Sequence, residues 1–349
     1  MVASILACLT PPAFAQEWAT RALCDVSDPV VDISAYSDID FARAQAEAAA
    51  IPNAVGNFWK IESTDGAVSY LWGTNHANNP TVLDLPDAVK AEIEAARVVA
   101  LEFDPVFRSR AEVTRFNTEE DPFLGPDIRG TYPTNQLDTI LGPKLFNWID
   151  ARLAATGWGA DTALYLKPEY LAELMLSSPC DDFASGVYPG QDGLIQMMGE
   201  IAGARILSLE EPMAYRTKLG APGNRDLTFD LIRLFALSLD PDQTNAQWRS
   251  ATALYLQGQN ALSIRLEREY ARLKFGDNRG PAIQDHVDDY MLDERNRMFL
   301  KTAQPELEQG EVFIAIGSWH LPDNAGMVAL LRDAGFTVTR IVLPREVVE

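Results

Sequence analysis

The chain has 349 residues, 47% of them hydrophobic and 23% charged, which excludes a disordered, collagen-like or coiled-coil protein. Its 50 acidic and 29 basic side chains give a net charge of −21. Such a charge repels phosphate backbones, so we expect no nucleic-acid partner. No stretch reaches the roughly 18 uninterrupted apolar residues of a membrane helix, so we also expect no transmembrane segment.

The first 15 residues predict a signal peptide that is cleaved before Gln16. Residues 2–16 carry no charged side chain, and Ala13 and Ala15 form the A-x-A pattern of a cleavage site. The Lys or Arg that usually opens a signal is missing, so an apolar N-terminal segment without that role is the alternative. We expect a periplasmic or secreted protein whose mature chain, residues 16–349, forms a single domain.

Cleavage of the predicted signal would remove one of the three cysteines and leave Cys24 and Cys180. In an oxidising compartment this pair could form one disulfide. Two unrelated thiols are the alternative interpretation.

The N-terminal part of the mature chain predicts a helix followed by strands. A helix is expected over residues 41–50. Two β-rich runs, 57–62 and 67–72, flank an Asp-Gly turn, which predicts a hairpin. A second helix begins near Pro86, and the continuous apolar run over 97–104 predicts a strand buried on both faces.

The rest of the chain is mainly helical before it returns to strands. A loop is expected over 117–135, a strand over 204–210, and helices over 143–155, 168–177, 191–202, 227–238 and 244–274. The last elements are a strand over 311–317, a helix over 325–334 and a strand over 336–343. We therefore predict an α/β fold with a mixed central sheet built from both ends of the chain. A mainly helical insertion, about 106–300, would form a lid.

Two of the three histidines occur in the same local pattern, Gly73–His76 and Gly317–His320, each after a buried strand. Gly73 and Gly317 would let the chain turn tightly as it leaves each strand. Side chains just beyond the carboxyl ends of strands point into a shared crevice. Glu102 and Asp104, at i and i+2, face the same way at the end of a third strand. We expect His76, His320 and a carboxylate to lie together.

Two imidazoles and a carboxylate are typical ligands of a catalytic divalent metal with one open position. Such a metal lowers the pKa of water and polarises a carbonyl group. The alternative is that each histidine is an ordinary hydrogen-bonded polar residue near a strand end. The third histidine, His286, lies among acidic residues and is predicted to be a surface residue.

Three further residues have two interpretations each. Arg295 could hold a carboxylate or an anionic substrate group, or form an ion pair on an exposed helix. Asp192 could support the site or cap a helix. Glu210 could reach the crevice from the end of its strand or pair with a basic side chain.

These residues fall in an ordered set of segments that resembles the TraB/PrgY/GumN family, which includes the Tiki metalloproteases. The matching segments are Tyr70–His76, Val99–Asp104, Gly190–Gly193, Leu207–Glu210, Leu292–Met298 and Phe313–Leu321. Two departures affect loop shape: Pro322–Asn324 stands where the family usually has a local glycine, and Glu211 follows Leu209-Glu210 where the family has threonine.

The resemblance implies a divalent-metal hydrolase, because Tiki proteins are peptidases that use manganese or cobalt; zinc is also compatible. It implies that His76, His320 and Glu102 are the metal and catalytic positions and that Arg295 and Asn296 form the family's R-N pair. Glu102 is either a ligand or the general base. The residues expected to hold these side chains in place, without binding the metal themselves, are Asp104, Asp192 and Glu210.

The leading hypothesis is therefore an exported, metal-dependent, peptidase-like hydrolase whose partner is a peptide or protein substrate. A metal-free, esterase-like hydrolase would keep its activity in the presence of a chelator. A binding protein for peptides or polysaccharide fragments would keep its ligand after replacement of His76.

Overall fold

The computed structural model describes residues 23–103, 136–155, 159, 161–176, 178–180, 190–211 and 214–347. A six-stranded sheet forms its centre, in the order β4-β3-β5-β2-β1-β6. Its strands are β1 (Phe58–Glu62), β2 (Val68–Thr74), β3 (Val98–Leu101), β4 (Arg205–Ser208), β5 (Val312–Gly317) and β6 (Thr337–Arg340). The prediction of a sheet with strands from both ends of the chain is confirmed.

The sheet is mixed because the predicted hairpin adds an antiparallel strand to a parallel set. Strands β4, β3, β5 and β2 are parallel neighbours, whereas β1 pairs antiparallel with β2 and with β6. Parallel strands end at the same edge of a sheet, so the segments that follow β2, β3 and β5 come together.

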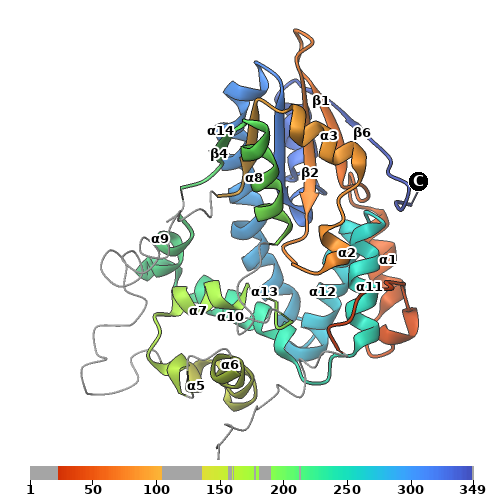
Figure 1. Ribbon diagram of the computed structural model, residues 1–349. Coiled ribbons are helices and arrows are strands. Elements are labelled where there is room, and N and C mark those ends of the chain that lie inside the picture. The colour runs from red at the N-terminus through yellow and green to blue at the C-terminus, as the bar shows by residue number, and fades with distance from the viewer. Residues whose placement is uncertain are drawn as a thin grey trace, which may run out of the picture.

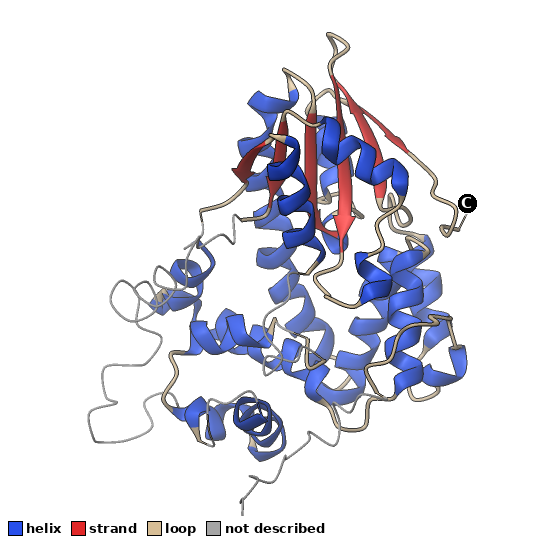
Figure 2. Cartoon of the chain, in the orientation of Figure 1, coloured by secondary structure: helices blue, strands red, loops and turns tan. Residues whose placement is uncertain are grey.

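Alternate residues of the central strand bury opposite faces of the sheet. Val312, Ile314 and Ile316 of β5 pack in one core with α14 and α15, and Phe313 and Ala315 pack in another with α3 and α8. Helices thus cover both faces (Figure 2). The covering helices are α3 (Asp87–Ala95), α8 (Gln191–Ala202), α14 (Arg295–Leu307) and α15 (Met327–Asp333).

A helical region lies beyond the carboxyl ends of the parallel strands, in the lower half of Figure 1. Many of its helices share a separate apolar core. Helices in this region are α5 (Leu137–Leu141), α6 (Pro143–Ala155), α7 (Pro168–Met175), α9 (Ala214–Gly220), α10 (Arg225–Phe235), α11 (Asn245–Leu256), α12 (Asn260–Phe275) and α13 (Arg279–Asp288). Two further helices, α1 (Phe41–Ala49) and α2 (Pro80–Leu83), precede them in the chain.

The single helix expected over 244–274 is wrong, because the segment forms α11 and α12 with a break between them. Gly258 lies in the break with φ +68°, and a Cβ there would lie 2.9 Å from the backbone nitrogen of Gly56. The break therefore depends on a close backbone contact that a helical pattern cannot reveal. The predicted signal peptide, the loop over 117–135 and Asp104 all lie outside the described residues.

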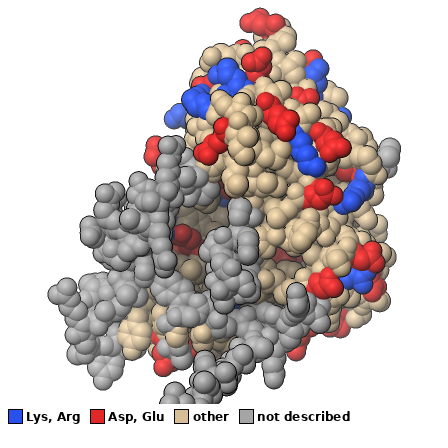
Figure 3. Space-filling model, in the orientation of Figure 1, with Lys and Arg blue, Asp and Glu red and all other residues tan. Residues whose placement is uncertain are grey.

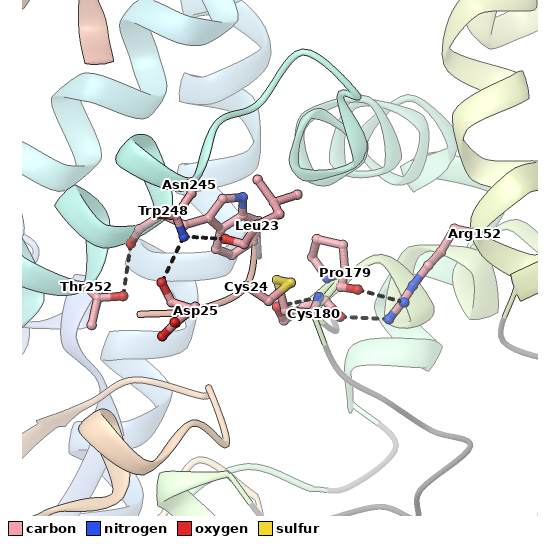
Figure 4. The surroundings of a disulfide bond; sticks show 10 residues. Leu23, Cys24, Asp25, Arg152, Pro179, Cys180, Asn245, Trp248 and Thr252 are labelled. Carbon is pink, nitrogen blue, oxygen red and sulfur yellow. Dashed lines mark hydrogen bonds between the residues drawn. A yellow bond between two sulfur atoms is a disulfide. The ribbon is translucent and has the colours of Figure 1, made fainter. Parts of the chain in front are cut away.

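A disulfide joins Cys24 to Cys180, which are 156 positions apart (Figure 4). It ties the N-terminal segment to the chain beyond α7. On one side Asn245 of α11 donates hydrogen bonds to the carbonyl groups of Leu23 and Asp25, and on the other Arg152 of α6 donates to that of Pro179. In the described part of the chain, no helix combines the length and apolar character needed to span a membrane.

Candidate functional site

The two predicted histidines and Glu102 meet at the carboxyl ends of β2, β3 and β5. His76 lies in the loop after β2, Glu102 directly follows β3, and His320 ends a 3₁₀ turn, Ser318–His320, after β5. These strands are neighbours, and Thr74 of β2 is in register with Gly317 of β5. The sheet topology therefore brings together residues that are far apart in the sequence.

One oxygen of Glu102 lies between the two imidazoles. Its Oε1 atom is 3.9 Å from Nε2 of His76 and 3.6 Å from Nε2 of His320. Only His76 is open to solvent: its side chain is 62% exposed, against 8% for Glu102 and 5% for His320. Solvent therefore reaches the cluster from the His76 side.

The Nδ1 atom of His76 contacts a carboxylate from α8. Asp192 Oδ2 lies 2.7 Å from it, and Asp192 Oδ1 accepts a hydrogen bond of 2.6 Å from the Thr74 hydroxyl group. The alternative that Asp192 caps α8 is wrong, because Gly190 occupies the cap position. A Cβ at Gly190 would lie 2.4 Å from the carbonyl oxygen of His76, so glycine lets α8 approach this loop closely.

Gln191, which the sequence analysis did not assign, organises the same loop. It is buried, and its Oε1 atom accepts hydrogen bonds from the Trp72 indole, the Asn75 backbone and the Tyr255 hydroxyl group. Tyr255 also donates to the carbonyl oxygen of Gly73. The family-like segment Gly190–Gly193 was the available signal, but it points to no partner on α11.

The Nδ1 atom of His320 instead contacts a neutral amide. Asn296 Oδ1 lies 2.7 Å from it, and Asn296 Nδ2 donates to the backbone carbonyl groups of His320 and Ala325. The ring of Phe299, one turn further along α14, lies 5.2 Å from the imidazole. Asn296 thus fixes the orientation of the His320 imidazole through its Nδ1 atom.

Arg295 joins Glu102 to Glu210 inside the protein. Its Nη2 atom donates to Glu102 Oε2 at 2.6 Å and to Glu210, and its Nε atom also donates to Glu210. The side chain of Arg295 is only 5% exposed, so the alternative of an ion pair on an exposed helix is wrong. A π-helix, Asp289–Glu294, directly precedes Arg295 and was not predicted. The arginine therefore contacts protein carboxylates rather than open space.

The two motif glycines are required for space rather than for a tight turn. Neither Gly73 nor Gly317 has a positive φ angle. A Cβ at Gly73 would lie 2.6 Å from the side chain of Leu321 and 3.0 Å from the Ser318 Cα atom. A Cβ at Gly317 would lie 3.1 Å from His76 Nε2 and 3.2 Å from Glu102 Oε1, so Gly317 leaves room in the middle of the cluster. The explanation from chain turning is corrected accordingly.

The surroundings give the three groups different charges. The Asp192 carboxylate raises the pKa of His76 to about 9. Burial lowers the pKa of His320 to about 3. Burial opposes ionisation of Glu102, but Arg295 outweighs it and holds the pKa of that carboxyl group well below its usual value. At neutral pH, and with nothing else bound, the cluster contains a cationic His76, an anionic Glu102 and a neutral His320.

Gly317 and Arg295 share the charge of Glu102. The backbone N–H of Gly317 donates to Oε1 at 2.7 Å, while Arg295 contacts Oε2. Burial raises the pKa of Glu210, the second carboxyl group on Arg295, although the arginine itself opposes that rise. His286 lies away from this cluster, with its side chain 45% exposed and Nδ1 2.9 Å from Asp230, as predicted for a surface residue.

The sequence matches the TraB/PrgY/gumN family over residues 57–340, which runs from the start of β1 to the end of β6. The chain belongs to this family. No curated protein and no solved structure matches it. Family membership covers the whole sheet and every residue of the cluster, and it agrees with the resemblance noted from the ordered segments.

In this TraB/PrgY/gumN protein the donor atoms are close but not in contact. Among the described residues, no three His, Cys, Asp or Glu side chains already have the spacing of a metal site. Atoms that bind one ion at about 2.0–2.2 Å lie roughly 3–4 Å from one another. The separations of 3.9 and 3.6 Å from Glu102 Oε1 to the two Nε2 atoms fall in that range. Two of the three donor–donor distances in the set are therefore those of atoms that share one divalent cation.

Proposed function

We propose that this protein is a divalent-metal-dependent hydrolase that cleaves peptides outside the cytoplasm. One observation carries the proposal: two imidazole Nε2 atoms face the same oxygen of Glu102, at 3.9 and 3.6 Å, across space that Gly317 leaves empty. Both Nδ1 atoms already contact a partner at 2.7 Å. Such outer partners fix which nitrogen of a histidine is free to bind a metal.

His76, His320 and Glu102 would hold the ion, and manganese, cobalt or zinc are compatible with nitrogen and oxygen donors. A bound divalent ion supplies an acidified water molecule and polarises the carbonyl group of a substrate. Asp192 and Asn296 orient the two imidazoles. Arg295 keeps Glu102 ionised and in place, so Glu102 remains ready to accept a proton or to bind the ion.

Export is part of the proposal. The predicted signal peptide and the Cys24–Cys180 disulfide both support it, because structural disulfides persist in oxidising compartments. The mass of the protein recovered from a periplasmic fraction would reveal cleavage after Ala15 and the loss of two hydrogen atoms on disulfide formation. An uncleaved, cytoplasmic and reduced chain would contradict this part.

A metal-free hydrolase is the second candidate, and the pair formed by His76 and Asp192 favours it. An exposed imidazole held through Nδ1 by a carboxylate has the arrangement of a general base that activates water. Its raised pKa counts against this role at neutral pH, because a protonated imidazole accepts no further proton.

Metal content tests the leading proposal directly. The untagged protein would be loaded with manganese, cobalt or zinc, dialysed and analysed for metal beside the His76→Ala/His320→Ala double variant. His286→Ala is the matched control, because it removes the one histidine outside the cluster. We expect about one ion per chain in the wild type and the control and none in a folded double variant.

Peptide hydrolysis with and without a chelator then separates the two candidates. Activity that disappears with EDTA and returns with metal supports the metal-dependent enzyme, whereas activity indifferent to EDTA supports the metal-free one. Equal, near-zero metal in all three proteins would contradict the metal site.

A further inference from the structure

A cavity outside the cluster of His76, Glu102 and His320 lies next to the turn that ends at His320. It has a volume of about 200 Å³ and lies between the N-terminal segment, α11, α12 and the turn that carries Trp319. His76, Glu102 and His320 are not among its lining residues. Trp319 immediately precedes His320, so one short turn contributes to both the cluster and the cavity.

Glu267 of α12 is the unusual carboxylate of this cavity. Its side chain is accessible to solvent, and it makes no hydrogen bond or ion pair with the described residues. The protein that surrounds it raises the pKa of Glu267 to about 7. By contrast, the buried Glu269 pairs with Arg43, and the buried Asp240 pairs with Lys274. Glu267 therefore lines the cavity with no cation beside it among the described residues.

Four aromatic side chains line the same space: Tyr36, Trp248, Tyr270 and Trp319. The faces of aromatic rings attract ammonium and guanidinium groups. The indole Nε1–H of Trp248 is buried and has no hydrogen-bond acceptor among the described residues. This donor has too little exposed surface to meet a ligand, so the attraction for a cation comes from the ring faces.

The remaining charges of the lining also favour a cation. Asp38 and Asp242 add two more carboxylates beside Glu267. The one lysine of the lining, Lys274, has its Nζ atom 2.5 Å from Asp240 Oδ2, which also accepts a hydrogen bond from the Tyr270 hydroxyl group. Its charge is thus already balanced from outside the cavity. An anionic ligand would be repelled by Asp38, Asp242 and Glu267.

We propose that this cavity binds the cationic side chain of a lysine or arginine residue in a peptide, with Glu267 as its counter-charge. The volume suits one side chain, since pockets for whole small molecules measure roughly 300–1,000 Å³. This inference rests on the proposed function, because it makes basic peptides the substrate class of the neighbouring site. Trp319 would separate the bound side chain from His320.

Binding to metal-free protein tests the inference without any need for catalysis. Isothermal titration in EDTA would compare the blocked peptide Ala-Lys-Ala with the same peptide containing norleucine, which lacks the ammonium group, and with 1,5-diaminopentane. We expect the lysine peptide to bind at least about tenfold more tightly than the norleucine peptide, the effect of a hydrogen bond to a charged group.

Glu267→Gln keeps the size of the side chain and removes its charge. It should weaken binding of the lysine peptide at least about tenfold, whereas Glu94→Gln, an exposed neutralisation on α3, should leave it unchanged. Because a proton competes with the cation for Glu267, affinity in the wild type should rise from pH 6 to pH 8, and this rise should disappear in Glu267→Gln.

Equal binding of the lysine and norleucine peptides, or an unchanged affinity in folded Glu267→Gln, would overturn the cation site. Binding of the diamine as tight as that of the peptide would overturn the peptide assignment. If metal content or hydrolysis fails while these binding results hold, the hydrolase proposal fails alone and the cavity remains a site for basic peptides.

Discussion

The two G-x-x-H segments are alike in sequence and in position, yet the structure gives their histidines opposite surroundings. Both follow neighbouring parallel strands, and Thr74 and Gly317 lie in register. His76 is open to solvent and contacts a charged carboxylate, Asp192. His320 is buried and contacts a neutral amide, Asn296.

This difference determines the charge on each side of Glu102. The pKa of His76 is raised to about 9, and that of His320 is lowered to about 3. The exposed histidine therefore carries a proton at neutral pH until something displaces it, whereas the buried one is already neutral. A short motif locates an imidazole, but the partner that comes from another segment decides what the imidazole can do.

The largest effect is expected from removing the charge of Arg295, which contacts both Glu102 and Glu210. Arg295→Gln would leave Glu102 and Glu210 buried without the guanidinium group that both contact, and we expect a loss of about 3–5 kcal/mol in the free energy of unfolding at pH 7.5. Arg295 holds the pKa of Glu102 low, so without it that pKa rises. The carboxyl groups then bind protons more readily, and the loss should shrink as the pH falls towards 5.

Urea unfolding at both pH values measures this effect. Arg297→Gln is the matched control, because Arg297 lies two positions away with its side chain 59% exposed and only a 3.6 Å contact with Asp293. It should cost less than about 1 kcal/mol. Similar losses in the two variants would show that the buried charge network is not what holds this end of the sheet.

The two motif glycines provide a smaller test. Gly73→Ala places a methyl group against Leu321 and the Ser318 backbone, and we expect a loss of about 1–3 kcal/mol. Gly317→Ala meets the exposed His76 at 3.1 Å and the buried Glu102 at 3.2 Å, both longer than the contact with Leu321, and should cost less than Gly73→Ala. It fills the space between the donors and should therefore abolish metal uptake. Thermal unfolding and metal analysis of both variants measure these effects. A Gly317→Ala variant that is less stable than Gly73→Ala and still binds metal would contradict the prediction.

The sequence predicted the sheet well because its strands have strong local signals. The Asp-Gly turn set the β1–β2 hairpin, and the continuous apolar runs set β3 and β5. The helices expected at 143–155 and 191–202 have these bounds in the structure. Placing His76, His320 and Glu102 at one edge followed from parallel strand ends alone.

What the sequence could not predict depends on contacts between distant segments. Asp192 lies 116 positions from His76, and Glu210 lies 85 positions from Arg295, so spacing indicated neither pair. The π-helix before Arg295 and the break at Gly258 likewise depend on neighbours in space. The family-like segments therefore pointed to Asp192, Glu210 and Asn296 as supporting residues, but not to the side chain that each one contacts.

The last test changes only the partner of the exposed histidine. Asp192→Asn keeps an oxygen beside Nδ1 of His76 but removes the charge, so the pKa of His76 should fall from about 9 towards its ordinary value of 6.5. A raised histidine pKa stabilises the fold below pH 6.5, and that contribution is lost as the pH rises through 9. The variant should therefore be less stable than the wild type at pH 6 and equally stable near pH 10. The difference at pH 6 should be less than about 1 kcal/mol, because solvent screens the charge of His76.

Nuclear magnetic resonance can follow this titration in metal-free protein, because the chain has only three histidines. The signals of His286 and His320 serve as internal controls and should be unchanged by the substitution. A fall confined to His76 would show that Asp192 alone makes the two motifs differ in charge. An unchanged His76 pKa would contradict this explanation and leave Glu102 as the remaining charged neighbour. Because Glu102 faces both imidazoles, it could not explain why only one of them is protonated.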